Sequence, residues 1–253
     1  KSDEKMKFTL SGVTSAYANT LRRLMLGDVP TMAIEDVTFV KNDSVLYDEI
    51  LAHRLGLVVL KTDLDSYNMT SMCKCKGAGC AQCQLKMTLR ASGPTTVYAK
   101  DIESADPNVT PVFGDTVLVK LHENQHLEVE AVATLGTGKE HSKWNPGLVW
   151  YYHEPTITVD NKHKDFKTFK SQFPPQIFNA KGEIEKERIS TPQLIDAVID
   201  VNPNIVNIKL DTSAFVFNVE SFGALTAPEI VTRALSVFEG QIKEFDGLVK
   251  QEL

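Results

Sequence analysis

The chain lacks the features that mark several large classes of protein. No run of residues approaches the about 18 consecutive apolar positions of a membrane-spanning helix, so we expect no membrane contact. The first residues, Lys1–Lys7, lack the apolar core of a secretory signal peptide, and we expect an intracellular, cytoplasmic protein. Basic residues are not in excess, since 27 Lys and Arg stand against 33 Asp and Glu, a net charge of −6. This balance disfavours a protein whose main task is to bind a phosphate backbone, although it leaves room for local basic patches.

Sequence motifs of common enzymes are also missing. The chain has no glycine-rich phosphate loop followed by Lys and Ser or Thr, and no Gly-x-Ser-x-Gly nucleophile turn. Metal-dependent nucleotidyl transfer needs clustered aspartates, and the nearest pattern, Asp63-Leu64-Asp65, is more typical of a turn. We therefore expect the chain to be non-catalytic by itself.

Cysteine is absent from all but one short segment. The four cysteines lie within eleven residues, in a Cys-x-Cys pair followed by a Cys-x-x-Cys pair, and Gly77 and Gly79 let the intervening chain turn back. A cluster of this kind in a reducing compartment is typical of a metal site, and four thiolates form a closed tetrahedral set for a structural zinc ion. Two disulfides or a redox pair are the alternatives. The predicted zinc ligands are Cys73, Cys75, Cys80 and Cys83.

The 253 residues are long enough for one large domain or for two to three small ones. Caps and helical spacing predict helices over residues 15–26, 48–55 and 192–198, with Asp48 as the cap of the second, and a long helix from Ala227 towards the C-terminus. Short apolar or alternating segments predict strands, and residues 41–143 form a β-rich module that carries the cysteine loop. The predicted strands are 6–10, 32–40, 57–60, 84–90, 97–100, 116–121, 127–134, 148–152, 156–159, 207–210 and 214–219.

The last predicted helix carries an apolar stripe over about six turns. A stripe of this length is awkward to bury within one small domain, so it indicates a helical partner in addition to an internal core. Burial wholly within the same chain is the alternative. The first predicted helix has an ordinary amphipathic pattern, with Leu21, Leu24 and Met25 on its apolar face and Arg22 and Arg23 at its side.

Four segments together resemble a known family. Residues 19–34, 48–57, 138–146 and 217–223 are similar, in that order, to characteristic segments of the α-like subunits of RNA polymerase. The family includes bacterial α, the third-largest subunit of eukaryotic polymerase II and their archaeal counterpart, and the similarity to the archaeal members is greatest. Each segment alone is weak evidence, but their order across nearly the whole chain makes the resemblance specific.

This resemblance implies an α+β fold with a split architecture. A dimerisation domain is expected from residues 1–40, 144–160 and 207–253, with the β-rich domain inserted at 41–143 and a small ferredoxin-like domain at 161–206. In the family, the two terminal helices pack on a small α-like partner, subunit L, and the pair forms a platform for the catalytic subunits. The partner-binding residues implied here are Leu21, Leu24, Met25, Ile230, Ala234, Leu235, Phe238, Ile242 and Phe245.

The resemblance also bears on cofactors. Eukaryotic relatives carry a four-cysteine zinc loop at the place of Cys73–Cys83, which supports zinc here. Many archaeal members of the family hold iron–sulfur clusters in the ferredoxin-like domain, but no cysteine follows Cys83 in this chain. Because such clusters are held by thiolates, we expect no iron–sulfur cluster, and the domain must be stabilised by its own core or by neighbours.

Polar docking onto the large polymerase subunits is expected at two places. Arginine suits such interfaces because its planar fork pairs with carboxylates in a bidentate way, with internal ion pairs as the alternative. Trp144 has a second interpretation as a core residue. The chain is thus predicted to bind subunit L, the large subunits and other small subunits, and to meet DNA only indirectly. The predicted docking residues are Arg22, Arg23, His53, Arg54, Lys139, His141 and Trp144.

Two functions from other classes remain as alternatives. A redox protein could use the ferredoxin-like segment, and a zinc-dependent nucleic-acid-binding protein could use the cysteine loop. The absence of later cysteines weighs against the first alternative, and the acidic balance of the chain weighs against the second.

Overall fold

The computed structural model describes residues 3–252, which group into two compact units. Unit 1 consists of the described residues within Lys1–Met6, Asn19–Val149 and Asn218–Leu253, and unit 2 of Lys7–Ala18 and Trp150–Phe217. The structure does not describe Lys1, Ser2 and Leu253. Lys1 and Ser2 belong to the segment expected to lack a signal peptide, and Leu253 is the end of the predicted dimerisation domain. No helix within residues 3–252 is long and apolar enough to cross a membrane.

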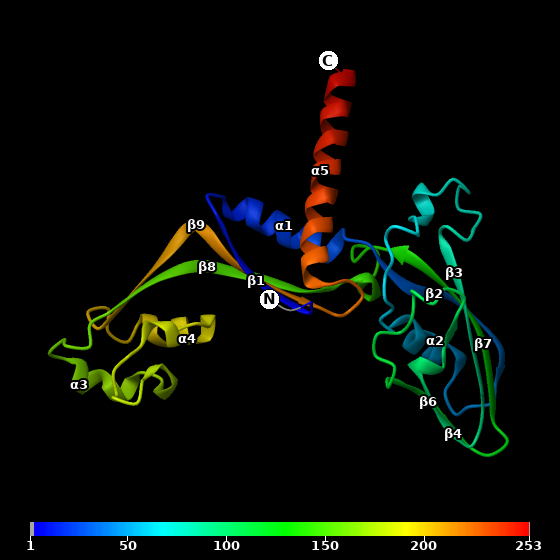
Figure 1. Ribbon diagram of the computed structural model, residues 1–253, viewed down its shortest axis with the longest axis horizontal. Helices are drawn as coiled ribbons and strands as arrows, with labels where there is room; N and C mark the ends of the chain where they lie inside the picture. Colours follow the sequence, from blue (N-terminus) through cyan, green and yellow to red (C-terminus); the bar gives the residue numbers. More distant parts are fainter. Residues whose placement is uncertain (1–2, 253) are drawn as a thin grey trace. The chain divides into compact units, whose positions relative to one another are not determined.

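A four-stranded sheet forms the centre of unit 1, with the strand order β2–β7–β3–β5. Figure 1 labels β2, β7 and β3 of this sheet. Side chains alternate across the sheet, so that Leu85, Met87 and Leu89 of β3 are buried whereas Lys86 and Arg90 are exposed. A separate two-stranded sheet pairs β4 with β6. The bounds are β2 Thr31–Asn42, β3 Gln84–Ser92, β4 Thr95–Tyr98, β5 Glu103–Ser104, β6 Val117–Leu121 and β7 His126–Gly136.

Three helices belong wholly or partly to unit 1. Helix α2, Asp48–Gly56, buries Leu51 and Leu55 in the core of the central sheet. Helix α5, Ala227–Glu252, begins with a capping box in which Thr226 and Glu229 each bond the other's backbone N–H group. Helix α1, Ser15–Gly27, begins in unit 2 and ends in unit 1, and the hydroxyl of Thr14 accepts a hydrogen bond from the Tyr17 N–H group at its start.

A second sheet has the strand order β1–β9–β8, with bounds β1 Lys5–Ser11, β8 Gly147–Val159 and β9 Val206–Ser221. In the part of this sheet that belongs to unit 2, aromatic side chains of neighbouring strands pack on one another. Phe8 of β1 stacks on Phe217 of β9 with 5.1 Å between ring centroids. The chain between β8 and β9 forms α3, Phe166–Phe169, α4, Pro192–Ile199, and several single 3-10 turns. These elements enclose an apolar core of their own. It consists of Phe173, Ile177, Ile184, Ile189, Ile195, Val198, Ile205 and Val206.

Most predicted helices and strands are present, but some local predictions are wrong. The predicted strand at Leu57–Leu60 is a turn after α2, and within it only Leu60 makes an isolated bridge, to Pro111. Its apolar residues Val58 and Leu60 are instead buried in the core of unit 1. Asp48 does not cap α2, because the cap position is Tyr47 and Asp48 lies in the first turn.

In the second sheet, two strands that were predicted as separate are in each case one continuous strand. Residues 148–152 and 156–159 join in β8 even though Pro155 lies between them. Proline is tolerated there because β8 is an edge strand, where a backbone N–H group is not needed on the open side. Residues 207–210 and 214–219 likewise join in β9.

The predicted domain limits stay predictions, and the structure adds two facts about them. The limit between residues 40 and 41 falls inside β2, whose pairing with β7 already begins at Thr31. The predicted ferredoxin-like segment, 161–206, lies entirely in unit 2 and contains the separate core described above. The mixed composition of helices and antiparallel sheets confirms the α+β fold class.

Candidate metal loop and partner-binding surface

The cysteine segment is a closed loop at the entry to β3. Its base is fixed by a hydrogen bond of 2.7 Å from the Asn68 N–H group to the Gln82 carbonyl. Lys76, Gly77 and Gly79 have positive φ angles of 52°, 85° and 81°, which turn the chain back on itself. The φ of Gly79 lies in the left-handed region, so a larger side chain would be strained there, and Gln84 would also have to move aside.

The four sulfur atoms converge on one point. Cys73 Sγ lies 3.5 Å from Cys80 Sγ, Cys75 Sγ lies 3.5 Å from Cys83 Sγ, and all four lie within 4.8 Å of one another. A tetrahedral zinc ion with bonds of about 2.3 Å requires S···S distances of about 3.8 Å, so the donor set fits zinc. The distances are far longer than the about 2.05 Å of a disulfide, and all four cysteines are free. The geometry therefore favours a metal site over two disulfides.

The thiols influence one another strongly. Hydrogen bonding from Cys73 lowers the pKa of Cys75 to about 6, whereas burial raises the pKa of Cys83 to about 12. The cluster therefore readily holds a single thiolate that its neighbours stabilise. A cation is needed to deprotonate the remaining thiols together, because each further thiolate in this small space repels the first.

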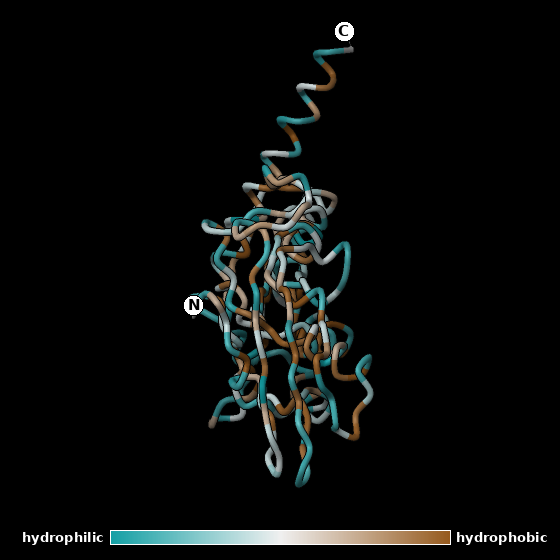
Figure 2. The backbone as a smooth tube through the Cα atoms, turned by 90° about the vertical axis from the view of Figure 1, so that its right-hand side faces the viewer, coloured by the Kyte–Doolittle hydropathy of each residue, from teal (hydrophilic) through white to brown (hydrophobic). Residues whose placement is uncertain are grey.

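Helix α5 changes character along its length. In its first turns Ile230 and Ala234 are fully buried within the chain. Beyond them the exposed fractions of Leu235, Ile242 and Phe245 are 44 %, 52 % and 68 %. Figure 2 shows apolar and polar residues alternating along α5 to its end. With Phe238 and Val249 these three residues repeat at alternating intervals of three and four, the 3.5-residue period of a coiled-coil seam. We call these five residues the α5 stripe.

Only some of the residues implied to bind the partner are exposed on the surface of the chain. The structure buries Leu21, Leu24 and Met25 of α1 in the chain's own fold, with exposed fractions of 4 % or less. Ile230 and Ala234 are also covered, so these five residues are not on the surface. Leu235, Ile242 and Phe245 are exposed and Phe238 is half-buried. Leu248, which is 56 % exposed, was not identified from the sequence.

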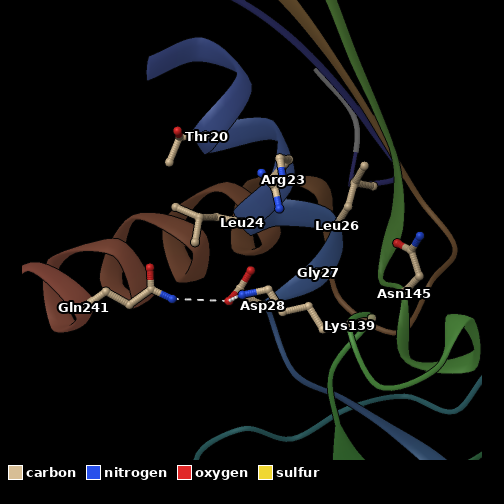
Figure 3. Close-up of a pocket in the computed structure, with 10 residues that line it drawn as sticks. Thr20, Arg23, Leu24, Leu26, Gly27, Asp28, Lys139, Asn145 and Gln241 are labelled. Carbon is tan, nitrogen blue, oxygen red and sulfur yellow. Dashed lines mark hydrogen bonds and ion pairs between the residues drawn. The ribbon is translucent and has the colours of Figure 1, made fainter. Parts of the chain in front are cut away.

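The last residues of α1 and the middle of α5 line a cavity of about 360 Å³ (Figure 3). At its wall, Asp28 Oδ1 accepts hydrogen bonds from Lys139 Nζ at 2.5 Å and from Gln241 Nε2 at 3.2 Å. Arg23 is exposed in the same cavity. Asp28 and Gln241 were not identified from the sequence, since a lone Asp after a helix end and a Gln on a polar face carry no distinguishing signal.

The predicted docking residues lie in different environments. Arg22 bonds the side chain of Asn19 in its own helix, and Arg54 donates to the Leu118 carbonyl at 2.6 Å. Both arginines are thus bonded within the chain through neutral acceptors, and within the described residues neither makes the internal ion pair that was the alternative. Arg23, Lys139, His53 and His141 are exposed, although Lys139 is paired with Asp28. His53 and His141 line a small hollow beside α2.

Trp144 is a core residue, which corrects its prediction as a docking residue. It is only 7 % exposed, and its Nε1–H group donates to the Thr134 carbonyl. The indole ring lies against Gly136, where an added Cβ atom would collide with it. The neighbouring Lys143, which was not identified from the sequence, lies over the Trp144 ring and pairs with Glu35.

Comparisons with known proteins agree with one another. The family described as the RNA polymerase Rpb3/RpoA insert domain matches residues 33–163. The chain is 38 % identical to DNA-directed RNA polymerase subunit Rpo3 of Methanosarcina acetivorans, over 99 % of this chain and 96 % of that protein. It is 34 % identical to the subunits of the same name from Methanosphaera stadtmanae, over 100 % and 97 %, and from Archaeoglobus fulgidus, over 98 % and 95 %.

Proposed function

The chain belongs to the family of subunit Rpo3 of archaeal DNA-directed RNA polymerase, and from this premise we propose that it is a non-catalytic assembly subunit of such a polymerase. Similarity that extends over 99 % of the chain favours this role over an independent redox or nucleic-acid-binding protein. In this role the chain contributes to a nucleotidyltransferase complex without holding its reacting groups. A polymerase subunit works where the genome is transcribed, so a cytoplasmic location is part of the proposal.

The observation that carries the proposal is the α5 stripe. Leu235, Ile242 and Phe245 expose large apolar side chains at a 3.5-residue period, which suits a second helix. The proposed occupant is a helix of the small α-like partner, subunit L. The resulting heterodimer forms the platform on which the large subunits assemble. Arg23 and the cavity beside it, together with His53 and His141, are proposed to contact those subunits.

The metal loop has a structural part in this proposal. Cys73, Cys75, Cys80 and Cys83 are proposed to hold one zinc ion, whose charge neutralises the thiolates and whose four bonds brace the loop. A closed set of four sulfur ligands leaves no position for a reacting water, so we assign it no catalysis. No cysteine outside this loop is present to hold an iron–sulfur cluster.

The proposal is tested by co-expression with the small α-like partner. We expect a stable one-to-one complex in light scattering, whereas the chain alone self-associates or aggregates because Leu235, Ile242 and Phe245 of the α5 stripe are left exposed. A well-behaved monomer with no affinity for the partner contradicts the proposed function. Metal content, measured by mass spectrometry on the same preparation, tests the zinc assignment independently.

A further inference from the structure

Unit 2 carries a local excess of positive charge that the assembly role does not use. Residues 161–182 contain five lysines and a single carboxylate, Asp165, in a chain whose net charge is −6. All five lysines are exposed. They are Lys162, Lys164, Lys167, Lys170 and Lys181.

Three of these lysines recur at intervals of three along one short turn structure. Backbone hydrogen bonds from Phe166 to His163 and from Thr168 to Asp165 continue into α3 and a 3-10 turn that begins at Lys170. Residues three apart share a side in a 3-10 turn and lie about 60° apart in an α-helix, so Lys164, Lys167 and Lys170 follow one flank of the segment over roughly 10 Å. We call these three residues the lysine row.

The end of the row is held in place by aromatic rings. Lys170 Nζ lies 5.7 Å from the ring centre of Phe166 and 5.4 Å from that of Phe178. An added Cβ atom at Gly182 would approach Lys170 Nζ to 2.6 Å, so the backbone next to Lys181 lies against the row. Lys181 thereby adds a fourth charge near Lys170.

The charges of the row are not compensated within the fold. Among residues 3–252, no carboxylate lies within 4.0 Å of the amino groups of these five lysines. Three carboxylates near the segment contact other side chains, since Asp165 lies 3.6 Å from His163 Nδ1, Glu185 pairs with Arg188, and Glu187 pairs with Lys186. Asp160 and Glu183 flank the segment in sequence without an ion pair to any described residue. An anion that met the row would therefore not have to displace an existing ion pair.

We propose that the lysine row, with Lys181, binds the phosphate backbone of duplex DNA without sequence preference. Duplex DNA presents one negative charge per about 1.7 Å of its axis, so every lysine of a row this long can face phosphate at once. Lysine acts as a compact point charge on a flexible stem, which suits contacts that position a backbone rather than read bases.

Two other polyanions fit the surface less well. A protein partner needs an apolar centre, and no large apolar side chain within residues 161–206 is exposed. Single-stranded nucleic acid is bound on exposed aromatic platforms, whereas Phe166 and Phe178 are half-buried beneath Lys170. This contact adds to the assembly role and involves neither the α5 stripe nor the cysteine loop. It differs from the prediction from the sequence that the chain meets DNA only indirectly.

The test measures the salt dependence of DNA binding by the full chain co-purified with its small partner, or alone where it stays dispersed. The probe is a fluorescent duplex of about 30 base pairs, titrated between about 50 and 200 mM salt. The variant Lys164→Gln/Lys167→Gln removes two charges of the row. The matched control Lys186→Gln/Arg188→Gln removes two charges from the same unit that are already paired with carboxylates.

We expect a dissociation constant in the range of about 1 to 100 μM at the lowest salt, and a slope of log K against log salt that falls by about 2 in the row variant. The control should keep the wild-type slope. Equal slopes in the wild type and the row variant, or equal losses in both variants, overturn the proposal. Tighter binding of a single-stranded RNA of the same length, or of a polyglutamate peptide, overturns the assignment to duplex DNA.

Discussion

Asp28 and Gln241 join the end of α1 to the middle of α5 by a hydrogen bond of 3.2 Å, although 213 positions separate them in the sequence. Among the described residues, the ion pairs that α5 makes after Gln241 join two residues of α5 itself. Asp246 and Lys250 form one such pair. Residues 242–251 are exposed except for the half-buried Gly247. The bond therefore marks where the supported part of α5 ends.

Hydrogen exchange should divide α5 at this bond. In the chain without its partner we expect fast amide exchange after Ile242, because a helix segment without tertiary packing opens easily. The turn that contains Ile230 and Ala234 should be protected. Binding of the small α-like partner should slow exchange in the second half. Strong protection of residues 242–251 in the chain alone would contradict this division.

A single carboxylate on the α5 stripe should abolish partner binding. In Ile242→Asp an uncompensated charge is forced into an apolar interface, which weakens binding by at least about 100-fold, equivalent to about 3 kcal/mol. The matched control is Gly240→Asp, which places the same charge about 160° around the helix, in open space. The yield of partner that co-purifies with each variant is compared. Equal yields would show that the α5 stripe is not part of the interface.

Loss of two ligands should release the metal without unfolding the helices. We expect Cys80→Ser/Cys83→Ser to lose one zinc per chain and to show faster exchange between Asn68 and Gln84, because the loop then relies on its base hydrogen bond and a few local turn hydrogen bonds. Zinc content and hydrogen exchange are the measurements, and Ser71→Ala is the control within the same loop. Retention of stoichiometric zinc would show that the ion is bound elsewhere, and melting of α5 would show that the loop supports more than itself.

The sequence was most informative where the chemistry is local. The four cysteines lie so close together that spacing alone brings their sulfur atoms together, and the structure agrees. The capping box at Thr226 and Glu229 is also a local pattern, and it marks the start of α5.

Features that depend on distant partners could not be predicted in the same way. The period of the α5 stripe was visible, but the division between buried Ala234 and exposed Ile242 depends on where α5 leaves the rest of unit 1. The apolar run Leu57–Leu60 fits a strand or a packed turn equally well, and packing of Val58 and Leu60 decided between them. The lysine row was not predicted, because the net charge of −6 averages over the whole chain and does not show a local group of lysines.

Tyr67 gives a prediction for alkaline pH. Burial raises the pKa of Tyr67 to about 12, and the hydrogen bond that its hydroxyl donates to Asp106 at 2.9 Å contributes to this rise. An unfolded tyrosine ionises near pH 10, so the neutral form stabilises the folded state below that pH. This contribution, on the order of 2 kcal/mol, should be lost as the pH rises from about 10 to about 12.

Denaturation with urea across that pH range tests the assignment to Tyr67. The variant Tyr67→Phe should lose less stability over this interval than the wild type, and tyrosinate absorbance should lose its component near pH 12. If the variant and the wild type lose stability in parallel, another group is responsible.

The core of unit 2 should be sensitive to a single truncation, because the segment 161–206 contains no cysteine and depends on its apolar packing. Ile177 is fully buried among Phe173, Ile184 and Ile195. Ile177→Ala removes three carbon atoms from this core and should destabilise it by about 2 to 5 kcal/mol. Pro175→Ala, at an exposed position in the same 3-10 turn, is the control and should have a much smaller effect. Hydrogen exchange across residues 161–206 measures the difference. Unchanged exchange in Ile177→Ala would mean that contacts with other polymerase subunits, rather than this apolar core, hold the segment together.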